Sequence, residues 1–229
     1  MVNHIRENVS VRKNLLGEKV MRFIHKWSYV CANYLMKQQK ESNEKRRVYY
    51  YGFQIIIGAM VKGILLTAST LLLGTFVPTM VIMLVFASLR VIAGGYHMDT
   101  YGKCIATSLG LFLVAGVISQ YTYRFWSSEL VVIFTILSFI IGLFTIIKWA
   151  PSDTPNKPIT EPEEIRKFKR RSIIYVFVWL GAISLFTYFK LHMLIIAGCF
   201  GLLLEVFTIT PLGYRFFDVI SGKVAAVNK

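Results

Sequence analysis

The chain has 229 residues, of which 55% are apolar and 17% are charged, and its 26 Lys and Arg against 12 Asp and Glu give a formal net charge of +14. Because soluble proteins average about 25% charged residues, this composition argues against a soluble globular enzyme and excludes a disordered chain more firmly. Three cysteines, Cys31, Cys104 and Cys199, do not make a disulfide framework. The length allows about five to seven membrane spans of roughly 20 residues each.

Residues 1–47 are predicted to form a cytoplasmic, basic helical region. Between residues 12 and 40, apolar side chains recur at the spacing of one helical face, and Lys and Arg lie between them. The apolar positions are Leu16, Val20, Phe23, Ile24, Trp27, Cys31, Tyr34 and Leu35. The pattern is typical of an amphipathic helix on a membrane surface, and equally of a helix that packs against a membrane domain.

Six apolar segments follow, and they predict an all-α, polytopic membrane protein with about six transmembrane helices. We take residues 48–213 as the membrane domain, which includes a basic polar loop at 150–171, and residues 214–229 as a tail. The last two segments meet at a very short turn and predict a tight hairpin. The six segments are residues 48–74, 77–95, 104–123, 130–150, 172–189 and 191–210.

The positive charges indicate how the chain is oriented in a cell membrane. Of the 26 Lys and Arg residues, 22 flank the spans on one side, whereas only Arg124 and Lys190 fall on the other. Because cytoplasmic flanks carry the excess of Lys and Arg, both termini, the loop 150–171 and the segment 94–104 are predicted to be cytoplasmic. Blocks of charge between long apolar runs also argue against a nucleic-acid partner.

Three ionisable side chains, Lys62, Arg90 and Glu205, fall inside the predicted spans, where charges are costly. Arg90 and Glu205 both lie toward the cytoplasmic half, which favours a pair between them. Arg90 alternatively binds a substrate carboxylate or stabilises an oxyanion. A set of intramembrane charges also suits a transporter, so this class of protein stays open.

The segment between the second and third spans carries the residues for thiol chemistry. His97 and Cys104 lie seven residues apart, and an imidazole that accepts a thiol proton activates the sulfur for attack on a carbonyl. On a straight helix the two would lie roughly 10 Å apart, so the chain must bend between them. Gly102, with glycines just before His97, supplies the freedom for a bend. Lys103 and the positive end of the third span would stabilise a thiolate.

His192 and Cys199 have the same spacing, so spacing alone is weak evidence. The residues between them are apolar, whereas the interval from His97 to Cys104 contains Asp99 and other polar residues that suit a loop. We therefore interpret Cys199 as a packing residue, and Cys31 and His25 as packing or interface residues. Asp99 either orients the imidazole or is a solvated loop charge. No group of His, Cys, Asp or Glu offers three converging metal ligands, so neither a metal nor a cofactor is expected.

The pattern of Arg90, Gly95, His97 and Cys104 between two spans resembles the accessory gene regulator protein B family of quorum-sensing membrane cysteine endopeptidases. The loop KWAPSDTPNKPITEPEEIRKFKRRS is similar to the family's basic loop. The resemblance implies a short propeptide substrate with an amphipathic leader and an acidic tail. The family's cysteine removes the tail, holds the rest as a thioester, and permits closure of a thiolactone ring.

Carried onto this chain, the resemblance implies that Cys104 is the nucleophile and His97 the general base and acid. Arg90 and Gly95 occupy the other motif positions and are expected to support the site, as is Asp99. The basic residues Lys167, Lys169, Arg170 and Arg171 are candidates for binding the acidic tail. Membrane lipid and a second copy of the chain are further expected partners. A peptide or lipid transporter is the alternative function.

Overall fold

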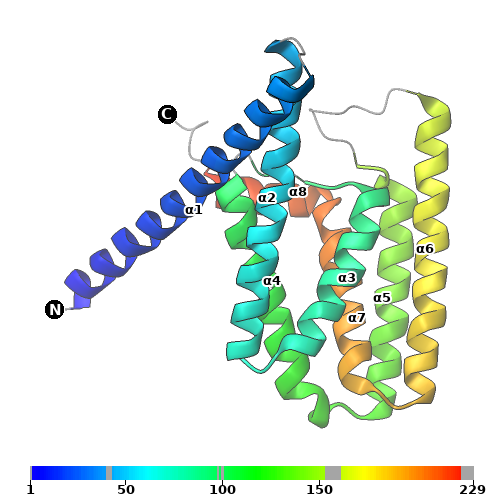
Figure 1. The fold of residues 1–229 in the computed structure, drawn as a ribbon. Helices are drawn as coiled ribbons and strands as arrows, with labels where there is room; N and C mark the ends of the chain where they lie inside the picture. Colours follow the sequence, from blue (N-terminus) through cyan, green and yellow to red (C-terminus); the bar gives the residue numbers. More distant parts are fainter. Residues whose placement is uncertain (1, 40–42, 97, 99–100, 153–160, 223–229) are drawn as a thin grey trace. The chain divides into compact units, whose positions relative to one another are not determined.

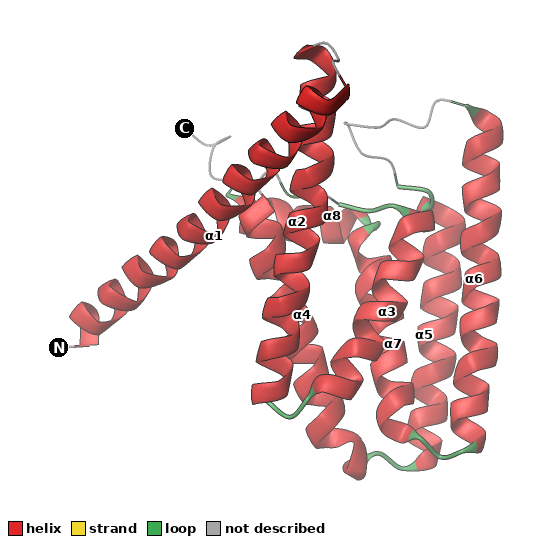
Figure 2. Ribbon diagram, in the orientation of Figure 1, coloured by secondary structure: helices red, strands yellow, loops and turns green. Residues whose placement is uncertain are grey.

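The computed structural model describes residues 2–39, 43–96, 98, 101–152 and 161–222. Over these residues the chain is helical and Figure 2 draws no strand, which confirms the all-α prediction. The elements are α1 (Val2–Gln39), α2 (Asn43–Leu72), α3 (Phe76–Ala93), α4 (Tyr101–Thr122), the short 3-10 helix η1 (Tyr123–Phe125), α5 (Ser128–Trp149), α6 (Pro162–Tyr188), α7 (His192–Thr208) and α8 (Pro211–Ser221).

The described helices match a multi-pass membrane protein. Helices α2 to α6 are each long and apolar enough to cross a bilayer. Helices α7 and α8 pass the same test together, as one segment bent by 80° at the short break between them. The total of five spans, or six if the bent pair is one span, agrees with the six apolar segments of the sequence.

Two helices begin before the apolar segments that predicted them. Helix α2 begins at Asn43, so the expected boundary at residue 47 falls inside a helix. Helix α6 begins at Pro162, so the basic residues 166–171 lie on a helix rather than in a loop. Proline is favoured in the first turn of a helix, and Glu163 and Glu164 there oppose the positive end of the helix dipole.

The predicted tail begins with a further helix, α8. Its first turn is capped by the Thr210 hydroxyl, which accepts a hydrogen bond from the backbone N–H of Gly213. Gly222 ends the helix in the left-handed conformation, with φ of 76°. Gly213, Phe217 and Ser221 recur every four residues and form its buried face.

The chain divides into two compact units. The first contains Met1–Ala68 and Thr100–Leu109, and the second contains Ser69–Asp99 and Gly110–Lys229. In the second unit α3, α5, α6 and α7 run side by side (Figure 1), and α7 contacts each of the other three. Helix α7 is the centre of this unit, because ten of its residues are buried.

Small residues let the helices approach α7 closely. A Cβ added at Gly201 would lie 2.9 Å from the carbonyl oxygen of Ile82 on α3, and one added at Gly198 would lie 2.6 Å from Ile183 on α6. Small residues at such contacts are typical of helices packed in a membrane. Substitution at these positions is therefore expected to separate the helices.

In the first unit α1 packs against both α2 and the start of α4. The His25 ring stacks on the Tyr50 ring of α2, with 6.2 Å between centroids. A Cβ added at Gly102 would lie 3.4 Å from Cγ of Met21, so α1 lies directly against the first turn of α4. On α1, Ile24, Ser28 and Ala32 are fully buried and mark the packed face. Packing of α1 against the helical domain, one of the two interpretations of its pattern, is therefore observed.

Candidate active site

The helical conformation ends with α3, and the predicted catalytic segment follows it. The N–H of Gly94 donates to the carbonyl oxygen of Arg90, and the chain then turns through φ of 76° at Gly94 and 135° at Gly95. L-residues rarely adopt such angles, so glycine is needed at both positions. His97 and Asp99 lie outside the described residues.

Cys104 lies in the first turn of α4, which begins at Tyr101. Because Met98 is not helical, His97 and Cys104 are not joined by one straight helix. Proton transfer between the two side chains requires such a break. Of the three glycines expected to give the chain freedom to bend, Gly94 and Gly95 have positive φ angles, whereas Gly102 is helical and packs against α1. Cys104 is half-buried and free, and its carbonyl oxygen accepts a 2.7 Å hydrogen bond from Ser108.

The backbone after α3 is held by the segment that follows α5. The N–H of Ser152 donates to the carbonyl oxygen of Ala93 at 2.8 Å, and the N–H of Gly95 donates to the carbonyl oxygen of Ser152 at 3.2 Å. A Cβ at Gly94 would lie only 2.0 Å from the Ser152 carbonyl oxygen. The start of the basic loop and the glycine pair thus fit together through backbone atoms, which explains why residue 94 is glycine.

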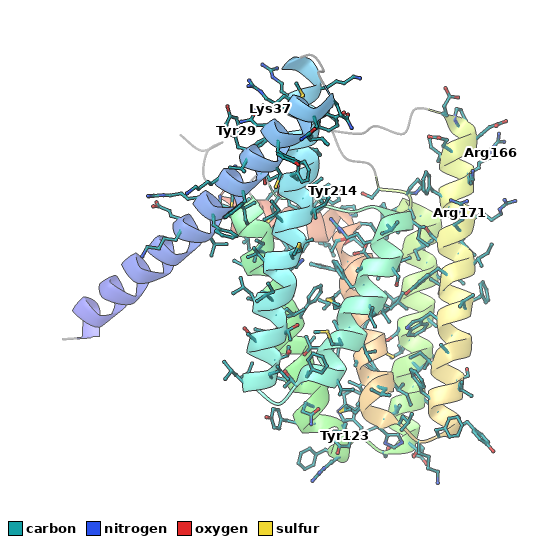
Figure 3. All side chains as sticks on the ribbon, viewed as in Figure 1. Tyr29, Lys37, Tyr123, Arg166, Arg171 and Tyr214 are labelled. Carbon is teal, nitrogen blue, oxygen red and sulfur yellow. The ribbon has the colours of Figure 1, made fainter. Side chains whose placement is uncertain are left out.

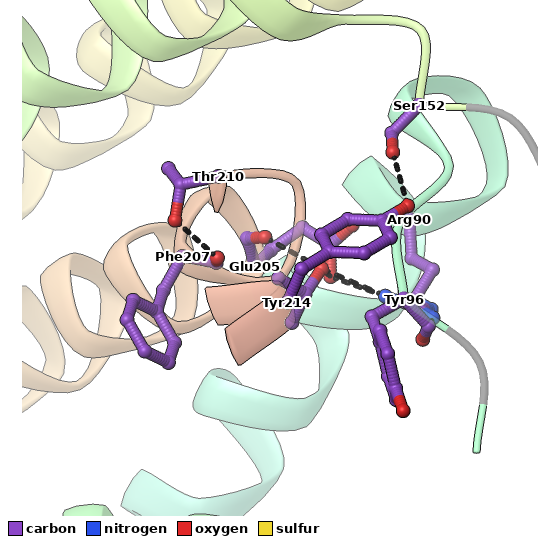
Figure 4. Close-up of polar contacts among 8 residues, drawn as sticks. Arg90, Tyr96, Ser152, Glu205, Phe207, Thr210 and Tyr214 are labelled. Carbon is purple, nitrogen blue, oxygen red and sulfur yellow. Dashed lines mark hydrogen bonds and ion pairs between the residues drawn. The ribbon is translucent and has the colours of Figure 1, made fainter. Parts of the chain in front are cut away.

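Arg90 forms the centre of a buried polar network, drawn in Figure 4. Its Nη1 donates to Thr208 Oγ1 at 2.8 Å and lies 3.5 Å from Oε2 of Glu205, so the predicted pair between Arg90 and Glu205 is present. Its Nη2 donates to the carbonyl oxygen of Tyr96. Glu205 is fully buried, and its Oε1 has no hydrogen-bond partner among the described residues.

The lack of a side chain at Gly95 makes room for the guanidinium of Arg90. A Cβ at Gly95 would lie 2.4 Å from Nη1 of Arg90 and 2.4 Å from Oγ1 of Thr208. The absence of a side chain therefore leaves the space in which the guanidinium binds Thr208 and the Tyr96 carbonyl. Arg90 and Gly95, two of the four motif residues, therefore act together to hold the backbone of Tyr96, which immediately precedes His97.

Tyr96 is clamped on three sides. Its N–H donates to the carbonyl oxygen of Thr208 at 3.1 Å, and its hydroxyl donates to Asp218 of α8 at 2.8 Å. Its ring stacks on Phe217 at 5.3 Å and meets the edge of Tyr214 at 5.2 Å. The Tyr214 hydroxyl in turn lies 2.7 Å from Oγ of Ser152 (Figure 4). Helix α8 therefore closes over the residue that precedes His97.

Sequence reasoning missed Tyr96, Ser152, Thr208, Tyr214 and Asp218. One signal was available. The stretch from Thr210 to Gly222 has an N-cap residue, a first-turn proline and a terminal glycine, and these predict a short helix. Nothing local to the sequence indicates that this helix would cover Tyr96.

The other sulfur and imidazole groups have ordinary packing environments. Cys199 is fully buried in the middle of α7, with its Sγ 3.7 Å from Thr135 Oγ1. His192 begins the same helix, and its Nε2 lies 3.4 Å from Oγ of Ser128. These two residues share one continuous helix, unlike His97 and Cys104. The interpretation of Cys199 as a packing residue agrees with its burial.

The basic residues proposed for substrate binding lie along the first turns of α6. Lys167, Arg170 and Arg171 are exposed, and Lys169 is half-buried. Figure 3 shows Arg166 and Arg171 projecting away from α6. Their charges are therefore available to a partner in solution.

Taken together, these features define a helical, multi-pass membrane protein with a partly buried ion pair beside the non-helical residues 94–96, which we call the connector. The family description "Accessory gene regulator B" matches residues 28–209. The chain therefore belongs to the accessory gene regulator B family. Membership of this family supports a role in quorum sensing.

Several curated relatives are similar over most of their length. The chain is 30% identical to accessory gene regulator protein B of Staphylococcus intermedius, over 70% of this chain and 80% of the relative. It is 24% identical to a protein designated AgrB-like protein 2 of Clostridium perfringens strain 13, over 85% of this chain and 95% of the relative. An AgrB-like protein of Listeria innocua is 27% identical over 72% of this chain and 76% of that relative. No solved structure matches the chain.

Proposed function

We propose that the protein is a membrane cysteine endopeptidase that removes the C-terminal tail of a quorum-sensing propeptide and permits thiolactone closure. The observation that carries the proposal is the position of Cys104 in the first turn of α4, shortly after Met98, which is not helical and directly follows His97 in the sequence. A helix N-terminus presents free N–H groups and a positive dipole end, and both favour a thiolate.

The proposed reaction needs no co-reactant. His97 accepts the proton of the Cys104 thiol, and Sγ attacks the scissile carbonyl carbon. The C–N bond breaks, the same proton passes to the departing amine of the tail, and a thioester remains on Cys104. The thiol of the propeptide's own cysteine then attacks this thioester. Its proton returns through His97 to the Cys104 sulfur as the thiolactone forms.

Arg90 and Gly95 are proposed as positioning residues. Nη1 of Arg90 contacts the side chains of Thr208 and Glu205, and Nη2 donates a hydrogen bond to the Tyr96 carbonyl oxygen. These donors therefore hold the connector and do not point to a substrate. This arrangement favours support of His97 over stabilisation of an oxyanion. Asp99, outside the described residues, is proposed to orient the imidazole.

The proposed substrate is a short propeptide with an amphipathic leader and an acidic tail. The exposed charges of Lys167, Arg170 and Arg171 on α6, with Lys169, would attract the tail. The cytoplasmic side is proposed for the site and both termini, because a newly made propeptide and a reduced thiol are both found there. A homodimer is proposed from the family resemblance alone.

The test is processing of the propeptide by full-length variants in membranes. Cys104→Ser and His97→Ala should each abolish tail removal without loss of membrane insertion, and Cys199→Ala should retain most of the activity. A propeptide whose ring-forming cysteine is replaced should accumulate as a thioester on Cys104, detected by intact-mass spectrometry. Normal processing by Cys104→Ser would remove the mechanism.

The alternative function was a peptide or lipid transporter, suggested by Lys62, Arg90 and Glu205. The contact between Arg90 and Glu205 accounts for two of these charges without a transported solute. A transporter would keep its activity after loss of the Cys104 thiol, so the same variants separate the two functions.

A further inference from the structure

The first unit contains an open cavity of about 500 Å³ between α1 and α2. His25, Lys26 and Tyr29 line it from α1, and Arg46, Arg47 and Tyr50 line it from α2. Its volume is in the range of small-molecule sites. Three of the six lining residues carry a formal positive charge, so the cavity is suited to an anion. It does not contain Cys104, and none of the residues assigned to peptidase chemistry lines it.

Contacts between the aromatic and basic residues shape the cavity. His25 Nδ1 and the Tyr50 hydroxyl lie 2.5 Å apart, so the two rings are joined by a hydrogen bond as well as by stacking. The guanidinium carbon of Arg46 lies 5.9 Å from the centre of the Tyr29 ring, within the range of a cation–π contact. These contacts bring α1 and α2 together at the cavity and orient one of its two guanidinium groups.

The cations that line the cavity have no anionic partner among the side chains that the structure describes. The ion pair described on α1 joins Arg22 to Glu18, which lie outside the cavity. Lys26 and Arg47 are exposed, and Arg46 is half-buried. An arginine fork and an ammonium group are the usual ligands of a phosphate oxygen, because both donate several charge-assisted hydrogen bonds.

The surroundings of the cavity are apolar. On α1, Phe23 and Trp27 are about half exposed, at 50% and 47%. On α2 the span begins at Lys45, and Val48 and Tyr51, which directly follow the cavity residues, are exposed. The cavity therefore lies where a basic segment meets the start of a membrane span, at the depth of lipid head groups.

From these observations we propose that the cavity binds the phosphate of an anionic phospholipid. Lys26, Arg46 and Arg47 contact the phosphate, and the acyl chains pack against the apolar side chains beside the cavity. A soluble phosphate would use the charges but not the apolar surface. An acidic peptide would likewise leave Phe23, Trp27 and Val48 exposed to water. A lipid uses both features, and clusters of basic residues next to a span are typical sites for acidic head groups.

The test is lipid binding by the full-length protein, delipidated in a neutral detergent and titrated with dioctanoyl phosphatidylglycerol, with native mass spectrometry as the readout. Loss of one basic residue beside a membrane is worth about fivefold in affinity. The double variant R46Q/R47Q should therefore bind at least tenfold more weakly than the wild type. Lys26→Gln should weaken binding by about fivefold.

The matched control is K19Q/K37Q, which removes the same charge from exposed positions of α1 outside the cavity. It should change binding by less than threefold. Thermal unfolding of each variant, followed by circular dichroism, checks that the helices are intact. Equal weakening by the control, or binding by R46Q/R47Q within twofold of the wild type, would refute the site.

Competitors identify the source of the anion. Dioctanoyl phosphatidylcholine, inorganic phosphate and a pentaglutamate peptide should each halve the amount of bound phosphatidylglycerol only at concentrations at least tenfold above that of the phosphatidylglycerol itself. Equal displacement by inorganic phosphate would mean a free phosphate site, and preferential binding of pentaglutamate would mean a peptide site. Either result overturns the lipid assignment.

Discussion

At the scale of single residues, the pairing of Arg90 with Gly95 explains a motif that sequence alone left unexplained. The guanidinium reaches Thr208 and the Tyr96 carbonyl through the space where a Gly95 side chain would be. Lysine would not replace Arg90, because its single ammonium cannot reproduce two separated donors in one plane. The charge on Glu205 would remain buried and poorly satisfied if Arg90 were lost.

Gly95→Ala is expected to disturb the connector more than it disturbs the helices. A residue with a Cβ at φ of 135° costs about 1–3 kcal/mol, and the new methyl group would also meet Arg90 and Thr208. We therefore expect a lower unfolding temperature in detergent and at least a tenfold loss of propeptide processing.

Gly110→Ala is the control for this substitution. Gly110 is helical, and a Cβ added there has no atom within 4 Å. Because alanine is favoured over glycine in a helix by up to about 1 kcal/mol, this variant should be as stable as the wild type or slightly more stable. Equal processing by the two variants would show that the Gly95 position does not matter to the site.

At the scale of elements, α8 is the part of the chain that the hydropathy pattern did not reveal. Its aromatic face packs on Tyr96, and its Asp218 accepts the Tyr96 hydroxyl hydrogen bond. A helix after the last span thus holds a residue that lies more than a hundred positions earlier in the sequence. We infer that α8 positions the connector rather than serving as a tail.

Tyr96→Phe is expected to reduce processing by about three- to tenfold while leaving the helix content unchanged. The substitution removes a hydrogen bond to a carboxylate, which is worth about 1.5–3 kcal/mol at most, and retains the ring packing. Asp218→Ala, which removes the acceptor of this hydrogen bond, should have a similar effect. The double variant should lose less activity than the two single losses added together, because both substitutions remove the same hydrogen bond.

Tyr121→Phe provides the matched loss of a tyrosine hydroxyl elsewhere in the second unit. The Tyr121 hydroxyl donates to the carbonyl oxygen of Leu73 at 2.8 Å, away from the connector. This variant should process the propeptide at the wild-type rate. If it loses as much activity as Tyr96→Phe, the effect is one of general stability and not of the clamp.

At the scale of the whole molecule, the second unit places the connector, the segment 150–152 and α8 at one end of its helices (Figure 1). The opposite end contains η1 and the turn between α6 and α7. This arrangement follows the alternation of spans, and it brings together segments that the charge distribution assigns to the same membrane side.

Chemical labelling would test the orientation. In a cysteine-free background, Arg124→Cys should react with a membrane-impermeant maleimide in intact cells, because η1 is predicted to face outward. Arg170→Cys, on the first turns of α6, should react only after the cells are permeabilised. The reverse pattern would place the termini and the proposed site outside.

The sequence by itself determined the membrane class, the number of spans and most of their bounds. These properties depend on local apolar length, so α3, α4 and α5 begin and end within about three residues of the predicted segments. The sequence also anticipated the contact between Arg90 and Glu205, because two charges at the same membrane depth have few other partners.

Only the tertiary structure decided how the connector is held. The contacts of Arg90 with Thr208, of Gly94 with Ser152 and of Tyr96 with Asp218 join residues from 58 to 122 positions apart. Such contacts depend on how whole helices pack, and no local pattern specifies them. For this reason the sequence alone did not show which of the three glycines, Gly94, Gly95 and Gly102, would have a non-helical backbone. Helix packing placed Gly102 against α1, and the backbone of Ser152 was available to Gly94 and Gly95.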